Sequence, residues 1–300
     1  MTTTRRTPEV SSRGLVSPAD YSDPITRWGV RLTQSVLMLG VALAGLVPIW
    51  WLVKGALSDT QDLIGHPLKA LPSALRWSNL SSAWNELQVG HYLLNTVVYA
   101  TGSCLMQVFV ATTAGFALSV LRPKFSNVVY AAILATLFIP GTVSLVALYL
   151  TVIHIPGLGV SIANTPLAIW LPAGAHAFNI LVAKQFFDAL PHELFDAAQV
   201  DGAGPVRIFW SLVLPLSRPM IAVVALLSLM AEWKNFLWPL VAMTDPSKQP
   251  LSVALPRLVT YSDQAMLIAG MLISTLPPLL AFIIFQRQVV RGIGFSGLKG

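Results

Sequence analysis

Six long apolar runs constrain this chain more than any other feature of its sequence. An α-helix needs about 20 residues to cross the hydrocarbon core of a bilayer, and each run reaches or exceeds that length. Only 11% of the 300 residues are charged, whereas a soluble domain carries about 25%. This number of charged residues is too small to cover the surface of a soluble protein of this size. The chain is therefore expected to be surrounded by lipid. The expected spans are residues 32–53, 93–121, 128–153, 166–187, 220–243 and 265–285.

The predicted fold is therefore an all-α polytopic membrane protein with six transmembrane helices. The membrane domain is expected at 32–287, with polar tails at 1–31 and 288–300. The first tail has no apolar periodicity and is predicted to be flexible. The run that follows it is too long for a signal peptide and lacks a small-residue cleavage site, so it is predicted to stay as the first span. The third span is expected to be broken at 139–141, which read Ile-Pro-Gly.

The distribution of Lys and Arg predicts which side of the membrane each connection faces. With six spans, both tails, the short turn at 122–127 and the long connection at 188–218 lie on one side. Counted with Lys184 and Arg287 at the ends of the adjoining spans, that side has thirteen basic residues, and the opposite side has five: Lys54, Lys69, Arg76, Lys248 and Arg257. Cytoplasmic connections carry the excess of basic residues. Both termini and the 188–218 connection are therefore expected in the cytoplasm.

The connection at 188–218 is a long charge-bearing interruption between two apolar runs. Leu194, Ala197 and Ala198 have the spacing of one helical face, and its two alanines would let another backbone approach closely. Gly202 can adopt positive φ at the break before a second helical piece. A rigid cytoplasmic connection of this kind could transmit movement from a soluble partner. The alternative is an ordinary solvated loop whose small residues arise by chance.

The same connection resembles the signature loop of the membrane subunits of ATP-binding-cassette importers. The pattern of that family is Glu-Ala-Ala, three residues, Gly, nine residues, an aliphatic residue, one residue and Leu-Pro. This chain departs from it only by an Asp in place of the usual Glu. The matching residues are Asp196, Ala197, Ala198, Gly202, Leu212, Leu214 and Pro215.

Further similarity runs from residue 32 to the C-terminus and is to the maltose-permease type of carbohydrate importer subunit. It rests on Asn95-Thr96, Ile139-Pro140, the Tyr149 region and the stretches 185–187, 233–240 and 297–300. The resemblance implies the type I importer permease fold in a bacterial inner membrane. It also implies a non-catalytic subunit that pairs with a second six-span permease, two ATPase subunits and an external solute-binding protein.

By the same resemblance, the loop forms the coupling helices that enter clefts on the ATPases. The residues expected to make this contact are Glu193, Asp196, Ala197, Ala198, Asp201, Gly202, Leu214 and Pro215. The chain contains no G-x-x-x-x-G-K-[ST] run, so ATP and Mg²⁺ are expected on the partner and no cofactor on this chain. The expected solute is a sugar or oligosaccharide. Glycerol 3-phosphate or a glycerophosphodiester is an alternative, and an ion-gradient-driven secondary transporter is an alternative of a different class.

Two polar residues in the fifth apolar run are candidates for the translocation pathway. Glu232 and Lys234 interrupt this run, and ionisable groups inside a membrane usually face the protein interior or a water-filled path, which Asn235 could also line. The alternative is that Trp233, Lys234 and Trp238 lie at the outer interface, where aromatic and basic side chains anchor helices. The sequence leaves both interpretations open.

Overall fold

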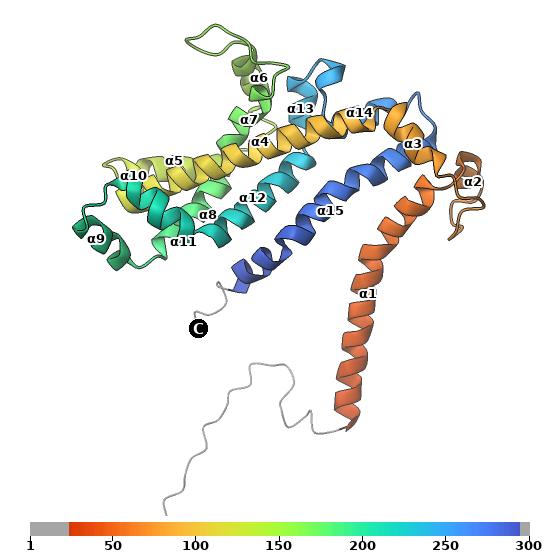
Figure 1. Ribbon diagram of the computed structural model, residues 1–300, viewed down its shortest axis with the longest axis horizontal. Helices are drawn as coiled ribbons and strands as arrows, with labels where there is room; N and C mark the ends of the chain where they lie inside the picture. The colour runs from red at the N-terminus through yellow and green to blue at the C-terminus, as the bar shows by residue number, and fades with distance from the viewer. Residues whose placement is uncertain (1–23, 295–300) are drawn as a thin grey trace, which may run out of the picture. The chain divides into compact units, whose positions relative to one another are not determined.

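The computed structural model describes residues 24–294, whose regular elements are all helical (Figure 1). The chain divides into two units, Met1–Lys54 and Gly55–Gly300. Helix α1 (Pro24–Ala56) makes up the described part of the first unit and contains Pro48. It begins before residue 32, where the first span was expected. Residues 1–23 and 295–300, which include most of the predicted N-terminal tail and part of the predicted C-terminal tail, lie outside the described part of the chain.

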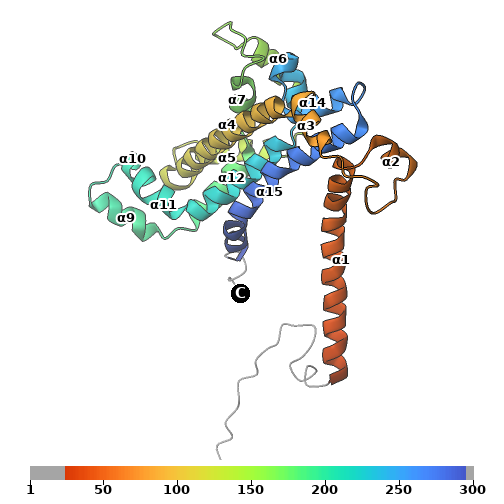
Figure 2. The same ribbon diagram turned by 45° about the vertical axis from the view of Figure 1, so that its right-hand side comes forward.

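Helix α4 (Val89–Phe116) is the axis of the second unit, and a π-helical turn, η2 (Ala117–Leu121), continues it. It packs against α7 (Leu167–Gly174), α8 (Ala177–Asp188) and α12 (Arg218–Trp233). Helix α12 in turn packs against α15 (Gln264–Gly294), and both views show α4, α12 and α15 side by side (Figures 1 and 2). The remaining helices are α2 (Thr60–Gly65), α3 (Ser78–Asn85), α5 (Ser126–Thr136), α6 (Leu145–Ile153), α9 (His192–Val200), α10 (Pro205–Ile208), α11 (Leu214–Leu216), α13 (Leu237–Ala242) and α14 (Leu251–Leu258), with short turns η3 (Phe209–Val213) and η4 (Pro246–Lys248).

Three of the described helices are long and apolar enough to cross a membrane, and up to five crossings result if each bent pair counts as one. The three are α1, α4 with η2, and α15 up to Gln286. The bent pairs are α7 with α8, at 45°, and the Pro205–Leu216 segment with α12, at 78°. The predicted span at 128–153 is divided into α5 and α6, with no regular helix from 137 to 144. Its Pro140 cannot donate a backbone hydrogen bond, which accounts for the break expected there.

The predicted fifth span, 220–243, is also not continuous. Helix α12 ends at Trp233, and α13 begins again only at Leu237. The side chain of Ser252 donates to the backbone oxygen of Asn235 at 2.7 Å, which ties this break to α14. Freed backbone groups inside a membrane must find partners of this kind within the protein.

Small residues allow α4 and α8 to approach each other closely. A Cβ atom added to Gly115 would lie 2.8 Å from the Cβ of Ala183 and 3.0 Å from the backbone nitrogen of Lys184. Such distances leave no room for a side chain. Glycine and alanine at helix contacts are characteristic of membrane bundles, where association depends on close packing.

Three groups of buried side chains hold the second unit together. One joins α3 and the start of α4 to α14 and α15, and another joins Tyr99 of α4 to α6, α7 and the end of α13. The third, which we call the loop-end cluster, joins the end of α4 to α8, α9, η3 and α12. Its aromatic members are Phe116, Phe187, Phe195 and Phe209, and its other members include Ile208, Val213, Met220 and Val224.

Candidate functional site

Helix α9 is the first helical piece of the 188–218 connection, and one aromatic side chain fixes it to the bundle. Phe195 is only 4% exposed and belongs to the loop-end cluster, against which Ala198 also packs. Phe195 and Ala198 are three residues apart and therefore share a face of the helix. Glu193 lies in the first turn, where a negative charge interacts favourably with the helix dipole. The sequence analysis missed the anchoring role of Phe195.

The end of α9 requires glycine. Gly202 has φ +77°, as the sequence analysis predicted. Its backbone N–H donates to the oxygen of Gln199 at 3.0 Å, and the N–H of Ala203 donates to the oxygen of Ala198 at 2.9 Å. This pair of bonds is the Schellman arrangement, which ends a helix through one residue in the left-handed region. Asp201 is the C-cap residue immediately before it.

Beyond Gly202 the chain returns to the bundle through α10, η3 and α11. Leu214 packs partly against the loop-end cluster, and Pro215 lies in the first turn of α11. The chain then bends by 78° into α12, with Ser217 between the two helical segments. Proline at 215 limits helical continuation, as expected from the sequence. The loop thus consists of two short helical segments, α9 and the segment from α10 to α11, which are joined at Gly202. The second segment contacts the bundle again at Leu214.

The outward face of α9 differs from the face predicted from the spacing alone. Leu194 and Ala197 are exposed, whereas Ala198 is half-buried against the bundle. Asp196 is exposed beside them, and Val200 has 87% of its surface accessible. An apolar side chain this exposed beside the exposed Leu194 suits a contact with another protein better than contact with water. Of the three residues predicted to form one face, Leu194 and Ala197 are therefore exposed and Ala198 packs on the bundle. Asp196 and Val200 belong to the exposed side together with Leu194 and Ala197.

The two segments predicted to share the cytoplasmic side do lie at the same end of the second unit. The hydroxyl of Ser119, just before the turn at 122–127, donates to Asp188 at the start of the 188–218 connection at 2.7 Å. These residues are 69 positions apart in the sequence. Opposite assignments to the two sides of a bilayer would be incompatible with this contact.

The pathway candidates Glu232 and Asn235 lie together at the break between α12 and α13. The Asn235 amide donates to a carboxylate oxygen of Glu232 at 3.2 Å, and both side chains are partly buried. Lys234 is exposed. Trp238 donates from its indole nitrogen to the backbone oxygen of Ala168 at 3.0 Å, so it contributes to helix packing. The structure therefore brings the two candidates into contact, whereas the side chain of Lys234 between them in the chain is exposed.

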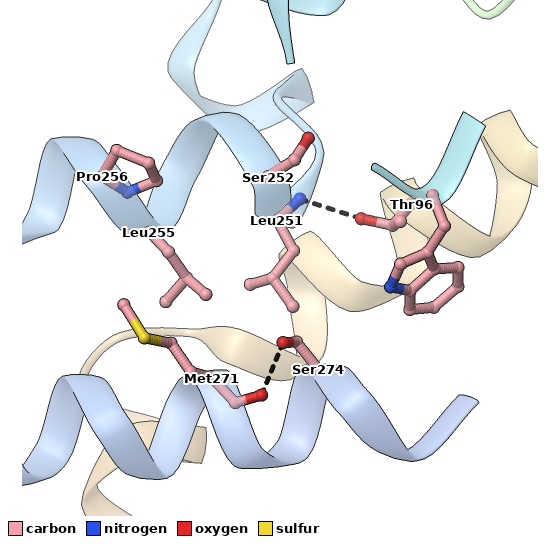
Figure 3. A pocket seen from close by; sticks show the side chains of 8 residues that line it. Thr96, Leu251, Ser252, Leu255, Pro256, Met271 and Ser274 are labelled. Atoms are coloured by element: carbon pink, nitrogen blue, oxygen red, sulfur yellow. Dashed lines mark hydrogen bonds between the residues drawn. The ribbon is translucent and has the colours of Figure 1, made fainter. Parts of the chain in front are cut away.

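A cavity of about 250 Å³ lies beside this break, between α4, α14 and α15 (Figure 3). Its lining residues are Thr96, Trp233, Leu251, Ser252, Leu255, Pro256, Met271 and Ser274. The hydroxyls of Ser252 and Ser274 both donate to backbone oxygens, at 2.7 and 2.6 Å, and Thr96 donates to the oxygen of Tyr92 at 2.8 Å. A hydroxyl has one donor and two lone pairs. Because each of these three hydroxyls already donates its hydrogen within the protein, it can only accept a hydrogen bond from a bound solute.

Three neutral polar side chains in the centre of the bundle were missed by the sequence analysis. Asn179 of α8 donates from its amide nitrogen to Gln107 of α4 at 2.7 Å and to Ser228 of α12 at 3.1 Å. Ser228 also donates to the same Gln107 oxygen, at 2.8 Å. All three are buried. We call them the central amide cluster. The only sign of this cluster in the sequence is the presence of amide side chains within apolar runs. Such side chains join membrane helices by hydrogen bonds.

Residues 107–294 match the family described as the binding-protein-dependent transport system inner membrane component. The chain is 30% identical to the sn-glycerol-3-phosphate transport system permease protein of Pectobacterium atrosepticum, over 89% of this chain and 97% of the relative. It is 26% identical to a diacetylchitobiose uptake permease of Streptomyces coelicolor, covering 87% and 86% of the two chains. It is also 30% identical to a lactose transport permease of Rhizobium radiobacter, covering 86% and 93%.

The fold is similar to that of a chain in the crystal structure of a bacterial ABC transporter that imports the acidic polysaccharide alginate. The TM-score is 0.74 at 22% identity, with 91% of this chain and 99% of that chain covered. This likeness confirms the importer permease fold expected from the signature loop. The match over 107–294 includes that loop, the break at Asn235 and the central amide cluster. The chain therefore belongs to the family of inner membrane components of binding-protein-dependent ABC transport systems.

Proposed function

We propose that this permease imports a sugar or oligosaccharide and that its 188–218 loop couples transport to ATP hydrolysis on partner subunits. The loop geometry carries the coupling proposal. Phe195 fixes one face of α9 to the bundle, and the Schellman turn at Gly202 fixes its end, so the exposed face is held in a set orientation. A docking element must be rigid if it is to pass on movement.

The proposed solute class is supported by the relatives and by the cavity near α14. Two of the relatives named above are permeases for diacetylchitobiose and lactose. The cavity offers hydroxyl acceptors beside the indole of Trp233, and a hydroxyl-rich solute brings donors and an apolar ring face. The first relative transports sn-glycerol 3-phosphate, which is the second candidate. It is also rich in hydroxyl donors, but its phosphate would require a cation that the cavity lining does not include.

The proposed assembly has this chain, a second and different six-span permease, two ATPase subunits and an external solute-binding protein. ATP and Mg²⁺ would be held by the ATPases. In this assembly the chain would cross the membrane six times, with α5 and α6 together forming the third crossing. Both termini would lie in the cytoplasm, in line with the thirteen basic residues assigned to that side.

Uptake by the reconstituted complex tests this function against the secondary-transporter alternative. The assembly is placed in proteoliposomes with ATP inside and loaded binding protein outside. Uptake of the radiolabelled solute should require both additions and should continue when an ionophore removes the ion gradients. Uptake that persists without ATP and stops with the ionophore would identify a gradient-driven carrier instead.

The proposed orientation predicts which engineered cysteines react from outside the cell. Cys104 is the only cysteine, so Cys104→Ala provides a background without thiols. In it, Ser81→Cys and Ser247→Cys should react with an impermeant thiol reagent on intact cells. Asn127→Cys and Val206→Cys should react only after permeabilisation. All four side chains are exposed in the chain, so access across the membrane decides the result. Labelling of Val206→Cys on intact cells would invert the orientation.

The pathway assignment predicts a transport defect without an assembly defect. Asn235→Leu removes the amide that donates to Glu232 and leaves a partly buried carboxylate without this partner. If the solute passes here, uptake should fall about five- to tenfold, the effect of one lost hydrogen bond or slightly more. Complex yield should not change. Asn127→Leu, which alters an exposed amide on α5, is the matched control. Unaltered uptake kinetics, or failed assembly, would favour the interface-anchor interpretation.

A further inference from the structure

The carboxylate of Asp188, at the start of the 188–218 loop, lies close to one hydroxyl group and two cationic groups. One oxygen accepts a hydrogen bond from Ser119 at 2.7 Å, and the other lies 2.6 Å from the ammonium of Lys184. The guanidinium of Arg122 is 3.9 Å away. The Lys184 and Asp188 side chains are only 19% and 33% exposed. Charged hydrogen bonds that are shielded in this way are stronger than pairs on an open surface.

These contacts connect elements that the chain order keeps apart. Ser119 belongs to η2 at the end of α4, whereas Lys184 and Asp188 lie on the last turns of α8. Arg122 adopts φ +44° directly after η2, and its side chain donates back to the oxygen of Ser119 at 2.7 Å. Its guanidinium is therefore directed by the turn and not free to follow a moving carboxylate.

Helix α5 joins the same group through an aromatic ring. The ammonium of Lys184 lies 4.8 Å from the centre of the Tyr130 ring, within the range of a cation–π interaction. The close approach of Gly115 to Ala183 and Lys184 holds the two backbones together one turn away. Asp188 is thus the point at which α4, α5 and α8 meet the loop.

The chain from Asp188 to α9 is short and hydrogen-bonded. The N–H groups of Ala189 and Leu190 donate to the oxygens of Phe186 and Phe187, both at 3.2 Å. Phe187 and Phe195, on either side of this connection, are both buried in the loop-end cluster. Because this connection is short and hydrogen-bonded, and not a flexible linker, a displacement of α9 would be transmitted to Asp188.

We propose that Asp188 is a positioning residue that transmits movement of the coupling loop to α4 and α5. This inference rests on the proposed docking of the loop to an ATPase. One carboxylate holds two cations and one hydroxyl, so its loss would leave Lys184 and Arg122 without their shared counter-charge. The movement it passes to α4 would reach the central amide cluster through Gln107, which lies on α4 and accepts a hydrogen bond from Asn179.

The test is Asp188→Asn in the full complex with its ATPases and binding protein, reconstituted in proteoliposomes. The residues of the docking face are unchanged, so ATPase subunits should co-purify in normal amounts. Solute transported per ATP hydrolysed should fall about tenfold, as expected for loss of hydrogen bonds to a charged group. Asp188→Glu keeps the charge and should recover most of the ratio. Ser119→Ala removes only the hydroxyl contact and should lower the ratio by about twofold to fivefold.

The outcomes separate this inference from the docking proposal. Glu86→Gln, an equivalent neutralisation at the exposed C-cap residue of α3, should leave the ratio unchanged. A normal transport-to-ATP ratio in both Asp188→Asn and Ser119→Ala would overturn the role of Asp188 while leaving docking untouched. Loss of the co-purified ATPases in Asp188→Asn, with no rescue by Asp188→Glu, would also contradict it. Failure of docking itself appears in a different variant, Asp196→Lys.

Discussion

Asp196→Lys is expected to release the partner ATPases from the purified complex while the membrane helices remain assembled. Asp196 is exposed on α9, and no side-chain hydrogen bond or ion pair of this residue occurs within residues 24–286. Charge reversal therefore leaves the contacts inside the chain intact and acts on the docked surface. Disrupting one member of a desolvated charge pair costs about 2–5 kcal/mol, or roughly thirty- to several thousand-fold in affinity. Co-purification of ATPase subunits with an affinity-tagged permease measures this loss directly.

Two controls limit the interpretation of that experiment. Asp196→Glu keeps the charge and restores the residue usual in the signature pattern, so it should retain both the ATPases and transport. Glu86→Lys reverses an exposed charge at the C-cap of α3, outside the 188–218 loop, and should leave ATPase co-purification unchanged. If Asp196→Lys retains its ATPases and its coupled hydrolysis, the 188–218 loop is a passive connector.

Gly202→Val should abolish coupled transport through the backbone of the loop. No atom lies within 4 Å of the position that a Cβ would occupy, so steric contact with neighbours is not the cause. The cause is φ +77°, which a β-branched residue adopts only at a cost of about 1–3 kcal/mol. Relief of this strain would break the two hydrogen bonds that end α9 and would reorient its exposed face. Hydrolysis stimulated by loaded binding protein is the quantity to measure.

Gly204→Val is a closely matched control for the same loop. Gly204 also has open space around its Cβ position, but its φ is −71°, which any residue adopts. Coupled hydrolysis should therefore be affected far less than in Gly202→Val. Equal losses in the two variants would show that added bulk, and not backbone conformation, disturbs the loop. Normal coupling in Gly202→Val would contradict the requirement for the Schellman turn.

Sequence reasoning found the features that depend on local chemistry. The second span was expected to end at residue 121, where η2 ends, and the sixth was expected to begin at 265, one residue after α15 begins. The positive φ of Gly202 followed from its place between two helical pieces. The break after Ile139 followed from Pro140. Each of these depends on residues adjacent in the chain, so periodicity and backbone preferences were sufficient.

Features that depend on contacts between distant segments were not found. Periodicity shows that a helix is amphipathic but not which helix it meets, so the sharing of Asn179 by Gln107 and Ser228 could not be foreseen. The apolar runs also did not reveal the 78° bend around Ser217 or the break between α12 and α13 within the fifth span. The outward face of α9 was assigned partly to Ala198 because the spacing did not reveal that Phe195 anchors the same helix from the inner side.

The π-helical turn at the end of α4 has a consequence for how such chains can change in length. Its backbone includes a bond from the N–H of Arg122 to the oxygen of Ala117, five residues earlier. An α-helix needs four residues for the same closure, so the turn contains one surplus residue. Loss of one residue between 117 and 121 would remove this surplus and leave a regular α-helical turn, with the segment after it close to its original direction. Loss of a residue within α4 itself would instead rotate everything after it by about 100° and direct Arg122 away from Asp188. A change of one residue in length should therefore be tolerated better at this turn than within α4.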